Sequence, residues 1–122
     1  KDIRLADGTL LANALLTLDP EPSKSYAFCS DTAYLPKLAD WVYGVNYLYH
    51  EATFLDMHQD LAKKTQHSTA AEAAQIAATA KVGQLILGHF SSRYPDRNEF
   101  ITQAQKHFNN VHLAEDGKRF DW

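Results

Sequence analysis

The sequence has little cysteine and no long hydrophobic run. Cys29 is the single cysteine, so no disulfide can form within the chain, and this usage is typical of a reducing compartment. No apolar run approaches the roughly 18 residues that a membrane-spanning helix requires. The N-terminus also lacks the basic and then apolar pattern of a secretory signal. We therefore expect a cytoplasmic protein that does not enter a membrane.

An excess of positive charge is also missing. Lysine and arginine number 12 and aspartate and glutamate 15, which gives a formal net charge of −3. Such a chain has no basic field that could bind nucleic acid by itself. With 122 residues, 45% of them hydrophobic and 22% charged, the composition predicts one globular domain or part of one. The chain begins with Lys1 and not with Met, which is expected of a processed or trimmed protein.

Residues 1–25 are predicted to be an irregular lead-in or an edge hairpin. Ala6-Asp7-Gly8-Thr9 is a turn signal, and the two prolines in Asp19-Pro20-Glu21-Pro22-Ser23 exclude a helix or a central strand. Two short apolar stretches in this region could form strands, Ile3–Leu5 and Leu10–Leu18. We expect this segment to belong to a single domain that spans residues 1–122.

Strand-like and helix-like segments alternate over residues 26–122. The expected strands are rich in β-forming residues and lie at Tyr26–Cys29, Val45–Tyr49, Leu85–Leu87 and Val111–Leu113. The expected helices between and before them cover about 35–44, 55–64, 70–83 and 96–108. Repeated strand–helix units are typical of an α/β fold, which is the predicted fold class.

The start of one helix is marked by a specific local signal. Thr69-Ala70-Ala71-Glu72 is a capping box, in which a hydroxyl is followed three residues later by a carboxylate. A narrow stripe of small apolar side chains follows, and Gly83 is expected to end the helix. The small side chains predict close packing of this helix on a sheet.

Ionisable side chains follow three of the expected strands. Asp31 comes after the first, the pair His50-Glu51 after the second, and His89 after the third. In open α/β sheets, ligands bind outside the carboxyl ends of the strands. We therefore expect these residues to line a site, together with His67 at the entrance of the capped helix. The alternative is that they only mark where the strands reach solvent.

The residue types favour metal-assisted chemistry. Aspartate and histidine are suitable ligands for Zn²⁺ or Mn²⁺, and one carboxylate can bridge two ions. A carboxylate such as Glu51 would hold the His67 ring in one orientation, which makes the pair a candidate general acid. As an alternative, His67 is an ordinary histidine of a surface loop.

Other ionisable residues are interpreted as structural or solvated. Asp56 and Asp60 would share one face of a helix from which His58 points about 200° away, so these three do not form a ligand cluster. His107 and His112 have no acidic neighbour in sequence. Cys29 is expected to be a small buried strand residue, since no cationic neighbour would activate it.

Four segments together resemble ribonuclease Z, the tRNA 3′-processing endonuclease of the metallo-β-lactamase superfamily. They occur in the family's order and approximate spacing: Phe28–Thr32, His50–Phe54, His67–Ala70 and Gly88–Tyr94. The closing segment Leu113–Gly117 is similar as well, so the resemblance extends over most of the chain. It implies that Asp31 bridges two zinc ions and that His89 is a terminal ligand of one of them.

The resemblance also implies the roles of four further residues. His67, oriented by Glu51, would deliver a proton to the leaving oxygen. Arg93 would meet a phosphate or the 3′ end of the tRNA. His50 belongs to the matching motif and is expected to support its neighbours without binding metal.

Part of the family pattern is not found in these residues. The block His-x-His-x-Asp-His and the tRNA-binding arm would both precede them. The chain is therefore expected to be the C-terminal half of a metallo-β-lactamase αβ/βα sandwich that lacks the zinc-ligand half, and to be inactive alone. The full-length protein would hold two zinc ions, form a homodimer and remove the 3′ trailer from precursor tRNA. The alternatives are another phosphodiesterase of the same fold and a non-catalytic α/β binding module.

Overall fold

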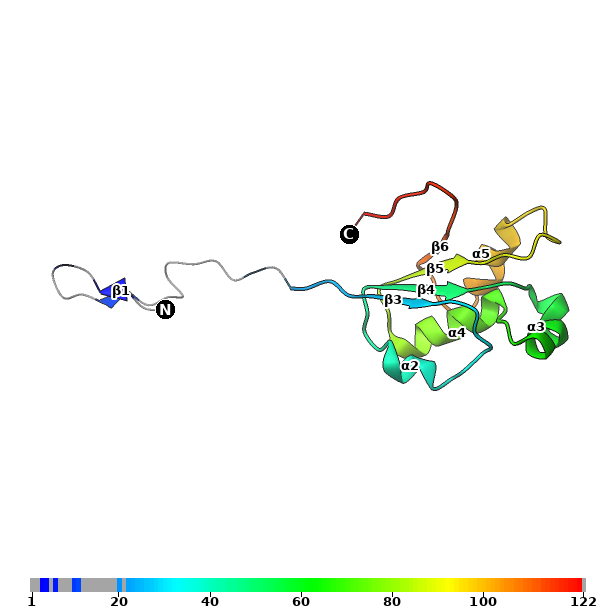
Figure 1. Ribbon diagram of the computed structural model, residues 1–122, viewed down its shortest axis with the longest axis horizontal. Helices are drawn as coiled ribbons and strands as arrows, with labels where there is room; N and C mark the ends of the chain where they lie inside the picture. Colours follow the sequence, from blue (N-terminus) through cyan, green and yellow to red (C-terminus); the bar gives the residue numbers. More distant parts are fainter. Residues whose placement is uncertain (1–2, 5, 7–9, 12–19, 21, 122) are drawn as a thin grey trace.

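Four parallel strands form the central sheet of the computed structural model (Figure 1). They are adjacent in chain order: β3 (Tyr26–Cys29), β4 (Tyr47–Glu51), β5 (Gln84–Gly88) and β6 (Val111–Leu113). All the predicted strands are found, but β4 lies two residues later than expected, so that His50 and Glu51 belong to the strand itself. The structure describes residues 3–4, 6, 10–11, 20 and 22–121.

The helices follow the strands. They are α2 (Leu38–Trp41), the 3₁₀ helix η1 (Asp56–His58), α3 (Gln59–Thr65), α4 (Ala70–Ala80) and α5 (Asn98–Ala104). Of these, α2 and α4 cover one face of the sheet, and α3 lies beyond the ends of the strands (Figure 1). Because each strand lies beside the next and parallel crossovers are right-handed, the connecting helices fall on the same side. In Figure 1, α2 and α4 lie below the sheet, and α4 also packs on α5. The core fills the space between, with Leu48, Leu85, Leu87, Ile76 and Phe100 almost fully buried.

Helix α4 begins as predicted and ends earlier. The Thr69 hydroxyl accepts the N–H of Glu72 (3.1 Å), and the Glu72 carboxylate accepts the N–H of Thr69 (2.9 Å), which completes the capping box. The prediction that Gly83 ends the helix is wrong, because Lys81 takes the left-handed conformation (φ 52°) directly after Ala80. Gly83 is required for another reason: a Cβ there would lie 2.6 Å from the carbonyl oxygen of Asn46.

Within the described residues, the opposite face of the sheet carries aromatic side chains and no helix. Phe28 is 62% exposed and stacks on Tyr49 with ring centroids 4.5 Å apart. The C-terminal segment crosses part of this face, where the Tyr47 hydroxyl donates to the carbonyl oxygen of Asp121 (2.8 Å). The sheet is therefore covered by helices on one side only.

The N-terminal region holds a second, separate sheet. β1 (Ile3–Arg4) pairs with β2 (Leu10–Leu11) in the antiparallel sense. This pairing matches the expected hairpin, but the hairpin is not an edge of the four-stranded sheet. The rest of the prediction for residues 1–25 falls partly outside the described residues, namely on 1–2, 5, 7–9, 12–19 and 21.

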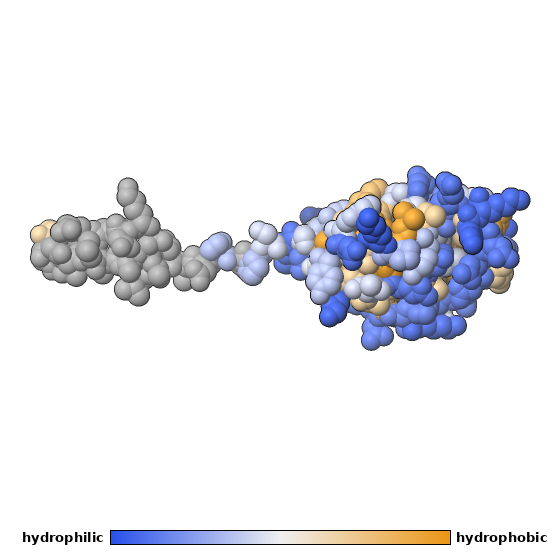
Figure 2. Space-filling view, turned by 90° about the horizontal axis from the view of Figure 1, so that it is seen from below, coloured by the Kyte–Doolittle hydropathy of each residue, from blue (hydrophilic) through white to orange (hydrophobic). Residues whose placement is uncertain are grey.

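The surface on the helix side is mostly hydrophilic. Figure 2 views the molecule from the side on which α2 and α4 lie, and it shows small hydrophobic areas between larger hydrophilic ones. In the part of the chain that the structure describes, no helix combines the length and the apolar character needed to cross a membrane.

Candidate metal centre

Four ionisable side chains meet at the carboxyl ends of the strands. The parallel register pairs Cys29 with His50 and His50 with Leu87, so the residues that follow these positions reach the same edge of the sheet. There Asp31, Glu51, His67 and His89 each offer one ligand atom, and these atoms all lie within 4.8 Å of one another. In the described ranges this is the only group of its kind.

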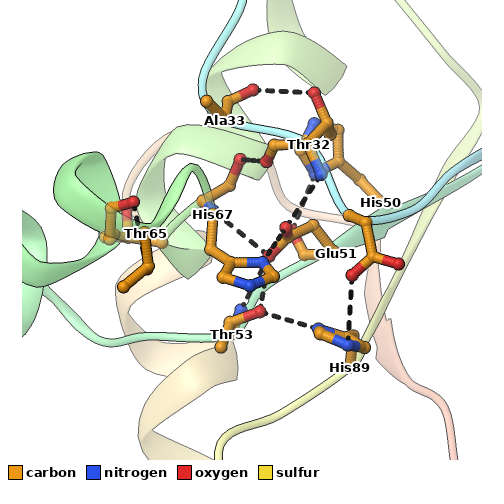
Figure 3. Close-up of polar contacts among 12 residues, drawn as sticks. Thr32, Ala33, His50, Glu51, Thr53, Thr65, His67 and His89 are labelled. Carbon is orange, nitrogen blue, oxygen red and sulfur yellow. Dashed lines mark hydrogen bonds and ion pairs between the residues drawn. The ribbon is translucent and has the colours of Figure 1, made fainter.

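Glu51 lies at the centre of the group and is fully buried (Figure 3). Its Oε1 accepts hydrogen bonds from the N–H of Thr32 (2.9 Å) and from Nδ1–H of His67 (2.6 Å). Its Oε2 accepts the N–H of Thr53 (3.2 Å), the Thr53 hydroxyl (2.6 Å) and the N–H of Ser68 (3.1 Å). These five donors satisfy the buried carboxylate. Glu51 therefore organises the group and has no free lone pair for a metal.

His67 is held in one tautomer by this carboxylate. Because Nδ1 donates to Glu51, Nε2 is the nitrogen that can exchange a proton with a ligand. The His67 backbone N–H donates to the carbonyl oxygen of Ala62 (2.8 Å), which ties the segment to the end of α3. The His67 side chain is 24% exposed, and its ring centroid lies 5.3 Å from that of His89.

The tautomer of His89 is set through Thr53. The Thr53 hydroxyl has one proton, which goes to the ionised Glu51, so its oxygen accepts from Nδ1 of His89 (2.8 Å). Nε2 of His89 then carries a lone pair, and it lies 3.3 Å from Oδ1 of Asp31. With a neutral His89 ring, two acceptor atoms face each other here, an arrangement that suits a bound cation, whereas a protonated ring would form an ion pair with Asp31.

The donor atoms fit a zinc ion. Aspartate oxygen and histidine nitrogen are ordinary zinc ligands at about 2.0–2.2 Å, and two ligands of one tetrahedral zinc are about 3.3 Å apart. The Asp31–His89 separation matches this spacing. Because a catalytic zinc usually has three protein ligands, these two residues would supply only part of such a site.

Both of these residues have a strained backbone. Asp31 has φ 50° and His89 has φ 61°, in the left-handed region that residues with a Cβ rarely adopt. Such strain persists only where the surroundings enforce it, and it is concentrated at functional sites.

Two further predicted site residues, His50 and Arg93, lie outside the group formed by Asp31, Glu51, His67 and His89. His50 is fully buried; its Nδ1 donates to the carbonyl oxygen of Glu51 (2.7 Å), and its Nε2 has no hydrogen-bond partner. Burial lowers the pKa of His50, although the hydrogen bond and the charge of Glu51 oppose this. Arg93 is exposed, and its guanidinium carbon lies 5.7 Å from the centroid of the Phe54 ring.

The residues set aside by the sequence analysis are not part of the group. Asp56 and Asp60 are exposed and His107 is exposed, whereas the His112 ring is half-buried with its centroid 5.9 Å from that of Phe120. Cys29 packs partly against the core, and burial raises the pKa of its thiol, which keeps it protonated.

Sequence reasoning missed the neutral partners of the site. Thr53 and Ser68 lie in the same short motifs as Glu51 and His67, and this closeness in sequence was the only available signal. It also missed Tyr94, whose hydroxyl donates to Nδ1 of His58 (2.5 Å) and accepts the N–H of Leu55 (3.1 Å). No sequence pattern links residues so far apart.

Comparison with known proteins agrees with the resemblance that the sequence motifs indicate. The chain is 47% identical over 113 residues to ribonuclease Z of Phocaeicola vulgatus, and 48% identical over 98 residues to ribonuclease Z of Cytophaga hutchinsonii. The chain is a homologue of part of ribonuclease Z. The first match covers 93% of this chain and 37% of that ribonuclease Z, and the second covers 80% and 31%. The chain thus spans about a third of the length of these relatives.

The fold agrees with this similarity to ribonuclease Z. A metallo-β-lactamase fold protein, YhfI from Bacillus subtilis, superposes with a TM-score of 0.74 at 22% identity, over 79% of this chain and 39% of that one. The predicted fold class, an α/β part of the metallo-β-lactamase sandwich, is confirmed. No protein-family model matches the chain.

Proposed function

We propose that the full-length protein carrying this chain is a zinc-dependent ribonuclease Z, which removes the 3′ trailer from precursor tRNA and leaves a 3′-hydroxyl. The main support for this proposal is one geometric observation. Oδ1 of Asp31 and Nε2 of His89 converge to 3.3 Å beside the hydrogen-bonded pair of Glu51 and His67. The similarity to proteins named ribonuclease Z selects RNA cleavage among the reactions that such a site can perform.

Asp31 and His89 would hold the metal in this protein. Zinc bound there would polarise the scissile phosphate and make a water molecule a better nucleophile at neutral pH. We expect two zinc ions per full-length chain, and the remaining ligands would come from residues other than those of this chain.

His67 would act as the general acid. Its Nδ1–H is held by Glu51, so a proton on Nε2 can be given to the 3′ oxygen that leaves the phosphorus. Glu51 keeps the ring in this orientation and is itself held by four other donors. Arg93, on the loop after His89, would neutralise charge on a phosphate.

Binding of precursor tRNA would depend mainly on surfaces outside this chain. This chain has a formal net charge of −3, which does not favour binding to a phosphate backbone. The basic surface would therefore lie elsewhere in the full-length protein or on the second subunit of a homodimer. We assign the reaction to the cytoplasm, where the single cysteine would stay reduced.

The proposal is tested on the purified full-length protein. Its zinc content is measured, and cleavage of precursor tRNA is compared with hydrolysis of bis(p-nitrophenyl) phosphate before and after chelation. We expect about two zinc ions per chain and chelator-sensitive release of the trailer. Hydrolysis of the small diester alone would support another phosphodiesterase of this fold. Absence of both zinc and cleavage would support a non-catalytic α/β module. The 122-residue chain alone is expected to cleave nothing, and metal-dependent cleavage by it would contradict this assignment of roles.

A further inference from the structure

A pocket of about 430 Å³ lies beside His67 and plays no part in the mechanism above. It is formed between the loop after β3, which contributes Tyr34, and helix α3, which contributes Asp60 and Lys63. Its volume falls within the range of about 300–1,000 Å³ that is usual for small-molecule sites. None of these three residues contacts the metal group through a hydrogen bond or an ion pair in the described part of the chain.

We propose that this pocket binds the nucleoside whose 3′ oxygen is the leaving group, which is the last nucleoside retained on the tRNA. This inference rests on the proposed function. It assigns a nucleoside subsite, with Tyr34 and Lys63 as the residues that recognise it.

The position of the pocket follows from the role of His67. A general acid must lie within hydrogen-bond distance of the oxygen that it protonates, so the sugar bearing that oxygen must lie next to His67. Two neighbours of the His67 ring are already defined, since Glu51 binds Nδ1 and the His89 ring lies 5.3 Å away between centroids. Phe54 is a third neighbour, with ring centroids 6.2 Å apart, and the pocket that His67 also lines offers space for that sugar.

A second pocket, of about 340 Å³, does not meet this requirement. It is lined by His89 and Arg97 and does not include His67. A nucleoside there would adjoin the metal ligand and not the general acid. The leaving nucleoside is therefore assigned to the pocket beside His67.

The side chains of the pocket match the chemistry of a ribonucleotide. Tyr34 is half-buried and packs partly against the core, so its ring is held as a platform on which a base can stack. Lys63 is exposed and supplies a cation for the phosphate on the 5′ side of the same nucleoside. Asp60 is an acceptor within reach of the pocket for a hydroxyl or an amino group.

The test uses the zinc-loaded full-length protein and two substrates. Tyr34→Ala and Lys63→Ala are each compared with the parent protein on precursor tRNA and on bis(p-nitrophenyl) phosphate, which contains no nucleoside. Loss of one stacking ring should raise KM for precursor tRNA on the order of tenfold. Hydrolysis of the small diester should stay within about twofold, because it contains no nucleoside and its nitrophenolate leaving group departs without a proton from a general acid. Tyr34→Phe, which keeps the ring, should restore the parent KM.

Matched controls lie outside the pocket. Tyr43 is 62% exposed and Lys64 is an exposed neighbour of Lys63 on α3, so Tyr43→Ala and Lys64→Ala should leave both substrates unaffected. Since Tyr34 also packs on the core, Tyr34→Leu keeps apolar volume while removing the stacking platform, and it should behave as Tyr34→Ala does.

The outcomes separate this inference from the proposed function. An unchanged KM for precursor tRNA in the Tyr34 and Lys63 variants of an active parent protein would overturn the subsite and leave the function intact. An equal loss on both substrates would show that the residues are structural, which also overturns the subsite. A parent protein that hydrolyses the small diester but not precursor tRNA would refute the function, and the subsite with it.

Discussion

The Thr53 hydroxyl lies 2.8 Å from Nδ1 of His89, although the two residues are 36 positions apart in the chain. The same hydroxyl donates to Glu51 (2.6 Å), and Glu51 accepts directly from His67 (2.6 Å). One buried carboxylate therefore orients both histidines, one directly and one through a threonine. The proposed general acid and the proposed metal ligand therefore share a single support, which would couple the two functions through Glu51.

Replacing the threonine hydroxyl should weaken metal binding. In Thr53→Val, nothing accepts the Nδ1 proton of His89, so the ring can rotate or adopt the other tautomer. We expect the zinc affinity of the full-length protein to fall about 10- to 100-fold, the usual effect of losing such a supporting hydrogen bond. Competition with a zinc chelator measures it. Thr53→Ser retains the hydroxyl and should bind zinc normally, and equal affinities in the valine and serine variants would contradict the relay.

The metal ligand and the general acid should separate by mutation. Asp31→Ala is expected to lose zinc and activity together, because it removes an acceptor atom of the metal group. His67→Ala should keep zinc and slow cleavage of precursor tRNA by roughly 10²–10⁴-fold, the usual contribution of a general acid. Zinc content and single-turnover rates are measured on the same samples, with the exposed His107→Ala as control. Loss of zinc from His67→Ala would identify His67 as a ligand.

Neutralising the central carboxylate should destabilise the protein. In Glu51→Gln, an amide N–H₂ replaces one acceptor oxygen and faces donors that remain in place. Each buried donor left without a partner costs about 1–3 kcal/mol. We expect a clear fall in the thermal unfolding midpoint. The exposed Glu115→Gln makes the same chemical change without burial, and a similar midpoint for both variants would refute the network.

Buried His50 should make stability depend on pH. Burial lowers its pKa in the folded protein below the ordinary value of 6.5, so the unfolded chain binds the proton more readily. The stabilisation is fully present above about pH 6.5 and decreases as the pH falls toward the lowered pKa. Urea unfolding between pH 7.5 and 5.5 should show a steeper loss for the parent than for His50→Asn, which keeps a donor near Glu51 but does not titrate. His107→Asn should keep the parent slope.

The hydroxyl of Tyr94 should stabilise the segment after β4. The ring is buried and packs on Phe100 with centroids 5.3 Å apart, so Tyr94→Phe removes only the oxygen. The N–H of Leu55 then loses its acceptor and His58 its donor, at a cost of about 1–3 kcal/mol. Denaturant unfolding measures this cost. The exposed Tyr43→Phe is the control, and an equally small effect of both changes would contradict the role of the Tyr94 hydroxyl.

Local structure could be predicted where the deciding contacts are short in sequence. The capping box depends on Thr69 and Glu72, three residues apart, so the start of α4 was predicted correctly. The end of α4 was not, because Gly83 is required by the backbone of Asn46, which lies far away in sequence. Strand β4 was placed two residues too early, since its pairing with β3 and β5 decides its bounds.

The amino-acid sequence by itself determined which residues are candidates for the chemistry, because each of the four motifs keeps its ionisable groups within a few positions of one another. Only the tertiary structure decided how those groups are arranged. The parallel register brings Asp31 and His89 to 3.3 Å, and a buried threonine sets which ring nitrogen of His89 is free. These hydrogen bonds join atoms of residues that are far apart in the chain and meet only in the folded protein. Neither the spacing of the motifs nor the composition could therefore predict them.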